Sequence, residues 1–598
     1  MPTTVLGRSS VAVFVVWSAL LILALQLRSR QAFKWDAFGY HLYLTAAFVH
    51  DDPFLKDGSW VDAERERVKA SGTLYQVTRL ENGVQVIKYP LGLSLLWAPW
   101  HLVGHGLALL TGHPTDGYSP PYQLAILTGV FVYLLCALLV LFRVLRMYFQ
   151  VPLAIALLVL VFFGTNLLDQ AISGWAMPHV MLFCGYCLLL DRTIVWKKHD
   201  RQIDAVRIAI IVGLMALIRP TEILAILIPL LWVNTSGMAA VRKDLQERRQ
   251  HWNRVFLILA MMGCIQFAYW WIATGQPLVD TYANAGEGLD LASPHTLPFL
   301  FSFRKGWLIY TPLMAFALVG LLALRRRIPG SFLAISLFLI AYVYITSSWT
   351  CWWYADSFGS RPMVAVYPVL LLPLGSLLQL LWERRTIVRI GLVLLMMALV
   401  AFNIFQLWQY TVGLIHPSRM TAVSYSAVFG ETRAPEGLSH LLLVDRSDST
   451  ATEAPDLARY SSKRLPLPNG PDGPGDEPEW SLSKDDPYSP AVRIPYRDIT
   501  KADHVRVETE WQIQAEHGTP LLSSVAVMVH GGKEYGYSAQ DLIVDEGGSG
   551  TWHVRSTFYL TPEIRDLDDE LSVYCWLRDT TRVTVRGPFI TVHEPRWP

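Results

Sequence analysis

The stretch that decides the fold is Pro121-Tyr-Gln-Leu-Ala-Ile-Leu-Thr-Gly-Val-Phe-Val-Tyr-Leu-Leu-Cys-Ala-Leu-Leu-Val-Leu-Phe142, an apolar run that contains no charged residue. A helix rises about 1.5 Å per residue, so a helix over this run is long enough to cross the ~30 Å hydrocarbon core of a bilayer. Arg143 and Arg146 follow the run directly, as basic residues do at the cytoplasmic ends of membrane helices. The sequence therefore predicts a transmembrane helix here.

The composition extends this interpretation to the rest of the chain. Of its 598 residues, 52% are hydrophobic and only 17% are charged, whereas soluble proteins carry about 25% charged residues. The formal net charge of +1 excludes a strongly basic nucleic-acid binder and an acidic disordered chain, so no nucleic-acid partner is expected. Six cysteines in so long a chain do not make a disulfide scaffold. A polytopic membrane protein with a soluble appendage remains.

Other apolar runs predict about eleven crossings. The run from Val11 to Leu27 is expected to be an uncleaved first helix, because it lacks a small-residue cleavage site. Residues 206–233 are interrupted by Arg219-Pro220 and are expected to form a hairpin of two short helices. Residues 91–110 are expected to be a re-entrant or juxtamembrane helix. The remaining expected spans cover residues 151–168, 178–195, 255–273, 307–324, 331–347, 362–382 and 387–408.

Basic residues in the short loops predict the orientation. Five clusters fall on one side if the spans alternate: Arg143/Arg146, Lys197/Lys198/Arg201, Arg242 to Arg254, Arg325 to Arg327, and Arg384/Arg385/Arg389. Arg28, Arg30 and Lys34 alone favour the opposite orientation, but the five clusters outnumber them. We expect a multi-pass protein of the bacterial inner (plasma) membrane, with a cytoplasmic N-terminus and an extracytoplasmic C-terminal domain.

The tail predicts a second domain. Hydropathy falls after Gly413, and the segment 436–490 is rich in Pro and Gly, as linkers are. Beyond it, residues 505–513 alternate between apolar and polar side chains, and Gly531-Gly532 is typical of a hairpin turn. We therefore expect a transmembrane domain over 1–435, a linker over 436–490, and a jelly-roll-like β-sandwich over 491–598. In that sandwich, the neighbouring aromatic residues Tyr574 and Trp576 favour ordinary cross-strand packing over sugar stacking.

One carboxylate stands out in the first outer segment. Asp36, Tyr40 and Tyr43 are spaced to lie on one stripe of a short helix. A carboxylate at a membrane surface can accept a proton or bind a cation. Taken alone, however, Asp36 also fits a helix N-terminal residue that stabilises the helix dipole.

Several cations are predicted on the same outer face, although Lys and Arg usually gather on the cytoplasmic side of a membrane protein. Lys88 precedes the apolar run at 91–110, where it either anchors the chain at the interface or binds a lipid phosphate. Arg304 and Lys305 stand at the mouth of one expected span, and Arg361 at the mouth of another. The tryptophans beside them are typical of an interfacial belt, but cations on this side need another reason, and an anionic ligand is the simplest.

Six further residues are candidates for substrate contact on this face: Tyr40, His179, Arg219, Glu222, Tyr310 and Asp356. Arg219 and Glu222 lie within an apolar segment, where ionisable residues are usually functional, although a mutual salt bridge is the alternative. No ligand spacing indicates a metal site, so no metal ligands and no required cofactor are expected.

This inventory suits the transfer of a sugar from a lipid-phosphate carrier. Cations would stabilise the leaving phosphate, and Asp36 would accept the proton of the acceptor hydroxyl. The alternative is a transporter or flippase of a lipid-linked sugar. Transporters usually show inverted repeats and midplane sites, whereas no repeat is evident here and the unusual ionisable residues gather near one face. A third hypothesis is a membrane-anchored carbohydrate-binding protein. Such a protein would need only one anchor helix, so about eleven expected crossings argue against it.

Four segments together resemble the GT-C superfamily of membrane glycosyltransferases, in particular bacterial relatives of protein O-mannosyltransferases and aminoarabinose transferases. They are Asp36 with Tyr40, Lys88-Tyr-Pro-Leu-Gly92, Arg304-Lys-Gly-Trp-Leu-Ile-Tyr-Thr-Pro312 and Asp356-Ser-Phe-Gly-Ser-Arg361. The resemblance covers about the first 410 residues. It implies an inverting transferase that uses a polyprenyl-phosphate sugar at the extracytoplasmic face.

The resemblance also assigns roles and shows departures. It implies that Asp36 is the catalytic acidic residue and that Lys88 contacts the donor phosphate. Tyr89 replaces the first proline of the related Lys-Pro-Pro-Leu motif, and Trp35 and Ala37 stand where many relatives carry a second acidic residue beside the catalytic one. The first departure concerns the geometry of the loop, and the missing second acidic residue weakens a metal-dependent mechanism. The expected partners are the lipid bilayer, the polyprenyl-linked donor and a glycan, lipid or protein acceptor.

Overall fold

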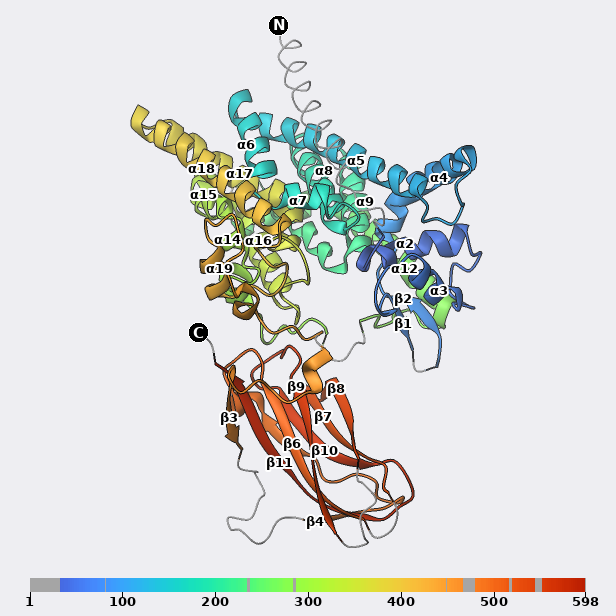
Figure 1. Cartoon of the computed structure of the whole chain (residues 1–598). Helices are drawn as coiled ribbons and strands as arrows, with labels where there is room; N and C mark the ends of the chain where they lie inside the picture. Colours follow the sequence, from blue (N-terminus) through green and yellow to red (C-terminus); the bar gives the residue numbers. More distant parts are fainter. Residues whose placement is uncertain are drawn as a thin grey trace. The chain divides into compact units, whose positions relative to one another are not determined.

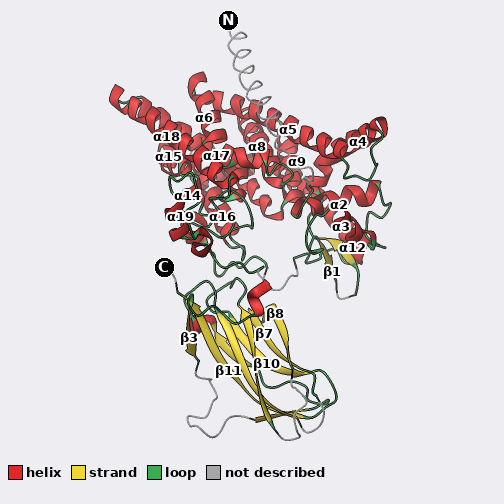
Figure 2. Ribbon diagram, viewed as in Figure 1, coloured by secondary structure: helices red, strands yellow, loops and turns green. Residues whose placement is uncertain are grey.

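The computed structural model describes residues 33–80, 82–233, 237–282, 287–447, 449–465, 479–515, 519–543 and 551–596. The chain divides into two compact units. The first comprises residues 1–283 and 294–418, and the second comprises residues 284–293 and 419–598. The first unit is mainly helical and the second mainly strands (Figures 1 and 2). The expected first span, 11–27, lies outside the described residues.

The helical unit begins with a polar segment that contains two helices and a small hairpin. These elements are α2 (Asp36–Phe48), α3 (Trp60–Arg67), β1 (Val77–Arg79) and β2 (Gln85–Ile87). The helices up to the middle of the unit are α4 (Gly92–Thr111), α5 (Pro120–Arg146), α6 (Val151–Phe163), α7 (Leu167–Ile172), α8 (Pro178–His199), α9 (Gln202–Ile218), the 3₁₀-helix η1 (Pro220–Ile226), α10 (Leu227–Leu231), α11 (Met238–Glu247) and α12 (Arg249–Thr274). The remaining helices are α13 (Thr296–Phe301), α14 (Trp307–Tyr310), α15 (Leu313–Arg327), α16 (Pro329–Ser347), the 3₁₀-helix η2 (Arg361–Val366), α17 (Tyr367–Trp382) and α18 (Thr386–Thr411).

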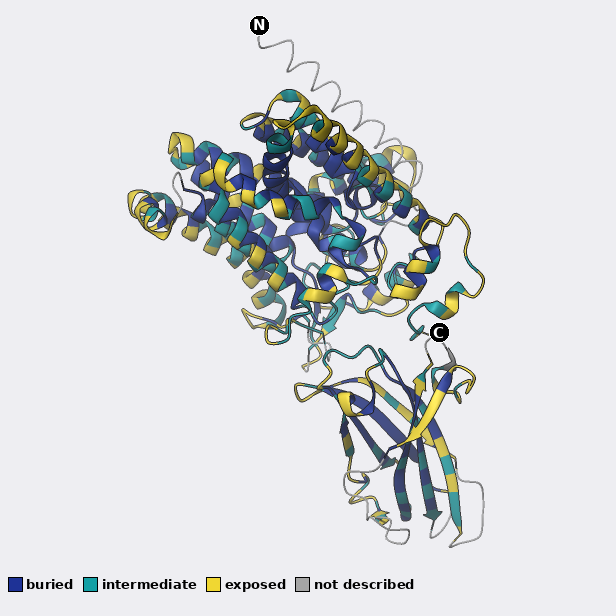
Figure 3. Ribbon diagram, turned by 90° about the vertical axis from the view of Figure 1, so that its left-hand side faces the viewer, coloured by how far each residue is buried: buried dark blue, intermediate teal, exposed yellow. Residues whose placement is uncertain are grey.

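Seven helices in the described part of the chain are long and apolar enough to cross a membrane: α4, α5, α8, α12, α16, η2 with α17, and α18. Large apolar side chains are exposed along α12 and α18, for example Leu257 and Leu394, while the interior of the unit is buried (Figure 3). Exposed apolar helix faces of this kind are stable against lipid. The polytopic membrane class is therefore confirmed, whereas the count of eleven crossings stays a prediction.

Three expected segments can be compared in detail with the helices observed. The segment expected at 91–110 is the single helix α4, Gly92–Thr111, which is long and apolar enough to cross a membrane. Whether it is re-entrant or juxtamembrane stays a prediction. The span expected at 307–324 starts only at Leu313, because Pro312 interrupts the helix after α14. The hairpin expected at 206–233 does break at Arg219, whose backbone is extended because a proline follows it.

Helix α4 is fixed between α5 and α9 by close backbone contacts. It runs antiparallel to the first half of α5, since Gly104 lies against Tyr122 while the Tyr133 hydroxyl donates to the Leu96 carbonyl at 3.1 Å. At its start, a side chain added at Gly92 would lie 2.4 Å from the backbone of Leu217 in α9. This contact holds the segment before α4 beside the end of α9.

Gly92→Ala is expected to destabilise the helical unit by about 1–3 kcal/mol, because the added methyl group meets backbone that cannot move aside as a flexible side chain would. The thermal unfolding midpoint in detergent measures the effect. Gly106→Ala is the matched control on the same helix, since nothing lies within 4 Å of its added methyl group. That variant should unfold at or slightly above the wild-type temperature, and equal midpoints for the two variants would contradict the close packing at Gly92.

The second unit is a sandwich of two antiparallel sheets. Its strands are β3 (Tyr460–Arg464), β4 (Glu479–Leu482), β5 (Val492–Pro495), β6 (Arg506–Ala515), β7 (Leu522–His530), β8 (Lys533–Leu542), β9 (Trp552–Leu560), β10 (Glu570–Leu577) and β11 (Val583–Pro595). One sheet has the order β5-β10-β7-β8, and the other has the order β3-β11-β6-β9, with β4 also paired to β11. With β4 set aside, this order is that of a jelly roll, as expected. Short helices accompany the strands: α19 (Ala422–Val428), η3 (Leu438–Leu441), η4 (Ser449–Thr452) and α20 (Tyr496–Ile499).

The predicted alternation and turn are both present in the sandwich. Trp511 of β6 is fully buried, and its indole N–H donates to the Ser524 hydroxyl of the facing sheet at 3.0 Å. Gly531 and Gly532 both have positive φ and join β7 to β8, which suits the twist of a tight hairpin. On the outer surface, Trp576 stacks with Tyr488 at 6.0 Å between ring centroids.

The range expected to be a linker contributes two strands to the sandwich. β3 and β4 both pair with β11. Each is only four or five residues long, too short for local periodicity to identify, and each is held by a strand more than 100 positions away in the chain. The Pro/Gly-rich centre of that range, 466–478, lies outside the described residues.

Candidate functional site

Asp36 is the first residue of α2, and the backbone before it is constrained. Trp35 has φ 52°, and its N–H donates to the Ala70 carbonyl at 2.9 Å, which joins the start of α2 to the segment after α3. A carboxylate in the first turn of a helix is stabilised by the helix dipole. The side chain of Asp36 nevertheless keeps 27% of its surface exposed, so a ligand can reach it.

Three side chains surround the Asp36 carboxylate. Tyr75 and Tyr89 donate their hydroxyl protons to Oδ1 at 2.9 and 2.7 Å. Arg361 approaches Oδ2 from a segment far along the chain, with an Nη2–Oδ2 distance of 3.5 Å. Burial, followed by the Asp36 charge, raises the pKa of Tyr75 and that of Tyr89, so both phenols stay protonated and act as donors. The carboxylate is therefore held in one orientation, with Oδ2 toward the cation.

Tyr89 binds to the predicted stripe of α2. Its ring lies 4.5 Å from the ring of Tyr40, and its carbonyl accepts a hydrogen bond from the Tyr43 hydroxyl at 2.8 Å. Gly39 makes this approach possible, since a side chain there would lie 2.3 Å from the Tyr89 ring. The stripe of Asp36, Tyr40 and Tyr43 therefore faces the segment before α4, and Tyr89 of that segment supplies a hydrogen-bond donor to the carboxylate.

Lys88 belongs to the same group of side chains. It is 5% exposed, and its ammonium lies 4.7 Å from the ring centroid of Tyr282 and 5.7 Å from that of Tyr75. Aromatic faces attract a cation without neutralising it. Because Tyr75 also contacts Asp36, the predicted base and the predicted phosphate-binding lysine are brought together through one phenol.

Arg361 has unused hydrogen-bonding capacity. It begins η2, and its side chain is 14% exposed. Its Nε–H is buried and has no hydrogen-bond partner among the described residues. Buried donors are normally satisfied, so an unsatisfied guanidinium N–H beside a partly exposed carboxylate is what a site awaiting an oxygen ligand would show.

The other two predicted cations hold the loop that leads to Arg361. Lys305 is 2% exposed and donates to both the hydroxyl and the carbonyl oxygen of Ser357, the former at 2.7 Å. Burial, with the nearby Arg361 charge second, holds the pKa of Lys305 well below its usual range. The Arg304 guanidinium lies 4.0 Å from the ring centroid of Trp353. Both side chains therefore contact the loop.

Arg219 and Glu222 form the salt bridge that was the alternative to a functional role. Glu222 is fully buried, lies 3.5 Å from Arg219 and accepts the Tyr186 hydroxyl proton at 2.6 Å. The Tyr342 hydroxyl lies 3.3 Å from Glu222 and 3.0 Å from the Pro362 carbonyl. The pair is thus connected to the backbone directly after Arg361.

The remaining predicted residues, His179, Tyr310 and Asp356, differ in burial and in their contacts. His179 is 1% exposed, and neither ring nitrogen has a hydrogen-bond partner in the described part of the chain. Tyr310 is also buried and donates to the Phe303 carbonyl at 2.6 Å, which is a structural contact. Asp356 is exposed.

Sequence reasoning did not identify four residues of this region. Tyr75, Tyr89 and Tyr282 surround Asp36 and Lys88, but their spacing along the chain carries no signal of that arrangement. Asp169 of α7 is 3% exposed, and burial raises its pKa to about 6. Its position in a short polar segment between two apolar runs was the only available indication.

A cavity of about 390 Å³ lies beside the start of α2. Lys34 and Trp35, the two residues before Asp36, line it together with Arg65 and Lys69. Glu66 also lines the cavity and pairs with Arg65 at 3.0 Å, so Lys34, Lys69 and the exposed indole of Trp35 are the groups that offer contacts to a polar ligand. Within the described residues, no group of three or more His, Cys, Asp or Glu side chains could hold a metal ion.

Comparisons with known proteins find likeness in structure and none in sequence. No family model and no curated protein matches the chain. A crystal structure of ArnT from Cupriavidus metallidurans bound to undecaprenyl phosphate has 16% identity and a TM-score of 0.40, over 67% of this chain and 64% of that one.

Two further structures are similar. The Archaeoglobus fulgidus oligosaccharyltransferase in the apo form has 13% identity and a TM-score of 0.36, over 71% of this chain and 57% of that one. The arabinosyltransferase EmbB from Mycobacterium smegmatis has 13% identity and a TM-score of 0.28, over 98% of this chain and 64% of that one. The chain thus spans less than two thirds of the length of each of the three structures.

Proposed function

We propose that this chain is a membrane glycosyltransferase that moves a sugar from a polyprenyl-phosphate carrier to an acceptor hydroxyl, with inversion at the sugar carbon. Asp36 is the general base, and Arg361 and Lys88 bind the donor phosphate. The observation that carries the proposal is the pairing of a partly exposed, oriented carboxylate with an arginine that keeps an unsatisfied donor. ArnT bound to undecaprenyl phosphate supports the class of donor.

The reaction needs both charges of this pair. The acceptor hydroxyl gives its proton to Oδ2 of Asp36 while its oxygen forms a bond to the anomeric carbon. The bond between that carbon and the phosphate oxygen breaks, and the phosphate leaves with the electron pair. Arg361 and Lys88 stabilise the charge that develops on this oxygen. Attack from the face opposite the leaving group inverts the configuration, and these steps use no metal.

The other residues support this arrangement. Tyr75 and Tyr89 orient the base, while Lys305 and Arg304 hold the loop that presents Arg361. The salt bridge of Arg219 and Glu222 fixes the same loop from the side of α9 and α16. The exposed Trp35 and its cavity accept part of a glycan, lipid or protein acceptor. We place the site at the extracytoplasmic face of a bacterial inner membrane.

Sugar transfer by the purified full-length protein in detergent tests the proposal. The assay supplies polyprenyl-phosphate sugars and extracts of glycan, lipid and protein acceptors, and detects the labelled sugar in a new product. Detergent removes the second compartment, so a transporter or flippase would give no product. A product whose anomeric configuration is that of the donor would contradict the single displacement.

Tyr89→Phe is expected to lower kcat about tenfold with little change in the KM for the donor, because the Asp36 carboxylate loses one charge-assisted hydrogen bond that orients it. Tyr89→Phe combined with Tyr75→Phe should lower kcat further than either change alone. Tyr133→Phe removes a hydroxyl that donates to the Leu96 carbonyl instead, and it should leave kcat unchanged. If the double variant kept the wild-type kcat, the proposed role of Tyr75 and Tyr89 in orienting Asp36 would be wrong.

A further inference from the structure

A second cavity lies among α5, α8 and α9 and belongs to a different part of the helical unit. Its volume is about 320 Å³. One part of its wall is aliphatic and consists of Val140, Leu188, Ile210 and Ile211. Leu188 and Ile210 are 40% and 41% exposed. An aliphatic, half-exposed wall on membrane helices is stable when it contacts a hydrocarbon chain.

Four charged residues, Arg143, Asp191, Arg192 and Arg207, also line the cavity. Two buried carboxylates hold their guanidinium groups in place. Asp191 is 1% exposed and binds both Arg143, with an Nε–Oδ1 distance of 2.9 Å, and Arg192, with an Nε–Oδ2 distance of 2.7 Å. Asp204 is fully buried and pairs with Arg192 at 3.1 Å and Arg207 at 3.2 Å. The carboxylates thus fix the positions of the guanidinium groups around the cavity.

The cluster keeps an excess of positive charge at its surface. Arg201 also approaches Asp204, at 3.3 Å, so four guanidinium groups share two carboxylates. The side chains of Arg143 and Arg207 are 54% and 52% exposed. Arg143 contacts Asp191 through Nε and Nη2, and Arg207 contacts Asp204 through Nη1. A guanidinium carries five N–H groups, so both arginines keep donors that can bind an anion.

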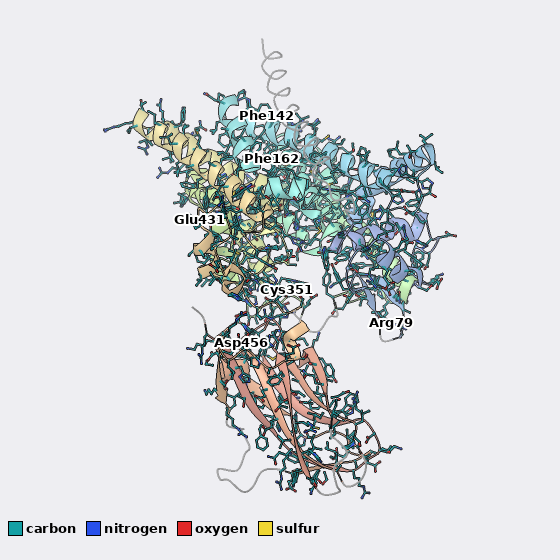
Figure 4. All side chains as sticks on the ribbon, viewed as in Figure 1. Arg79, Phe142, Phe162, Cys351, Glu431 and Asp456 are labelled. Atoms are coloured by element: carbon teal, nitrogen blue, oxygen red, sulfur yellow. The ribbon has the colours of Figure 1, made fainter. Side chains whose placement is uncertain are left out.

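This cluster lies at the opposite end of the helices from the Asp36 site. Along α8, Asp191 is twelve residues from His179, and along α9, Arg207 is twelve residues from Arg219. Twelve helical residues rise about 18 Å. Figure 4 labels Phe142, the neighbour of Arg143, at one end of the helical unit, and Cys351 and Arg79 at the other end. The cavity is therefore separate from the site proposed for polyprenyl phosphate.

We propose that this cavity binds an anionic phospholipid. The lipid phosphate contacts Arg143 and Arg207, and one acyl chain lies along the wall formed by Val140, Leu188 and Ile210. An apolar wall directly below fixed, half-exposed cations matches the two halves of such a lipid. A free phosphate would leave the aliphatic wall uncovered, and a neutral lipid would leave the excess charge unpaired. The lipid acts as a resident ligand at the end of the unit that faces away from Asp36.

Native mass spectrometry of the full-length protein tests this inference. The protein is purified in detergent, mixed with equal amounts of phosphatidylglycerol and phosphatidylcholine of the same chains, and measured for retained lipid. The wild type should retain phosphatidylglycerol at least tenfold better. Arg143→Gln with Arg207→Gln should weaken that retention about 30-fold, since each cation near a lipid surface contributes to the binding of anionic lipid. The retention of phosphatidylcholine should not change.

The controls separate a specific site from general attraction between charges. Arg254→Gln with Arg326→Gln removes two exposed arginines outside the cavity and should leave the retention of phosphatidylglycerol unchanged. Arg143→Lys with Arg207→Lys keeps the charge and should retain more phosphatidylglycerol than the Gln pair. If the Gln pair does not fold, the Lys pair is compared with the wild type instead, and it should still prefer phosphatidylglycerol to phosphatidylcholine. Equal retention of the two lipids by the wild type would overturn the inference, as would an equal loss in the control pair. A clear preference for polyprenyl phosphate over phosphatidylglycerol at this cluster would overturn the assignment of the occupant.

Discussion

Asp36→Asn is expected to lower sugar transfer by about 10²–10⁴-fold, the usual contribution of a general base. The substitution keeps the shape of the side chain and an oxygen that accepts from Tyr75 and Tyr89. It removes the charge that takes the proton from the acceptor. The abundance of the protein in membranes and its unfolding temperature should therefore stay close to those of the wild type. The measurement is initial rate with purified protein and a polyprenyl-phosphate sugar.

The matched control for this variant is Asp57→Asn. Asp57 is an exposed carboxylate of the same outer segment, and it accepts only a local hydrogen bond from Ser59 among the contacts described for it. Its loss should leave transfer within about twofold of the wild type, as for most surface substitutions. Full activity in Asp36→Asn would end the assignment of the base.

The same variant can also identify the product. Glycans, glycolipids and glycoproteins are profiled in a strain that lacks the protein and in a strain that carries only Asp36→Asn. If Asp36 is the base, the two strains lose the same sugar-bearing species. A product that disappears in the null strain but persists with Asp36→Asn would show that the chain contributes to it without this carboxylate.

Arg361→Gln is expected to lower kcat by about 10²–10³-fold, because a fixed cation is lost where the leaving phosphate gains charge. The kcat of Arg361→Lys should lie between those of the wild type and Arg361→Gln, since an ammonium keeps the charge but lacks the planar set of donors of a guanidinium. Arg79→Gln, which alters an exposed arginine in β1 of the same outer segment, should behave like the wild type. The unfolding temperatures of these variants show whether the loop that leads to η2 keeps its wild-type structure.

A binding measurement distinguishes phosphate contact from the mere positioning of Asp36. A short-chain polyprenyl phosphate without sugar is titrated into each variant. Arg361→Gln should weaken its binding at least tenfold, whereas Asp36→Asn should leave binding unchanged or stronger because a nearby negative charge is gone. Equal binding by wild type and Arg361→Gln would reduce Arg361 to a residue that orients the carboxylate.

Much of the fold could be predicted from local patterns. The uncharged run at 121–142 lies within α5, and the alternation at 505–513 lies within β6 from residue 506 on. The spacing of Asp36, Tyr40 and Tyr43 predicted the stripe that Tyr89 contacts. Hydropathy and periodicity act within a few turns of helix or residues of strand, so they can be recognised without knowing what packs against them.

The pairing of β3 and β4 with β11 could not be predicted in this way. Both strands lie in a segment rich in proline and glycine, and their hydrogen bonds come from a distant strand. The continuous helix α4 was likewise obscured by Pro99 and two histidines, which α4 accommodates against α2 and α5. In each case the contact that stabilises the element lies outside the element.

The sequence by itself determined the membrane class, the β domain and the candidate charges, because these follow from residue type and local order. Only the tertiary structure decided how those charges are used. It brings Arg361 to Asp36 across 325 positions, buries Lys305 against Ser357 and gives the carboxylate two tyrosine donors. The physical reason is that the exposure and partners of an ionisable group depend on packing between distant segments, which the order of residues along the chain does not record.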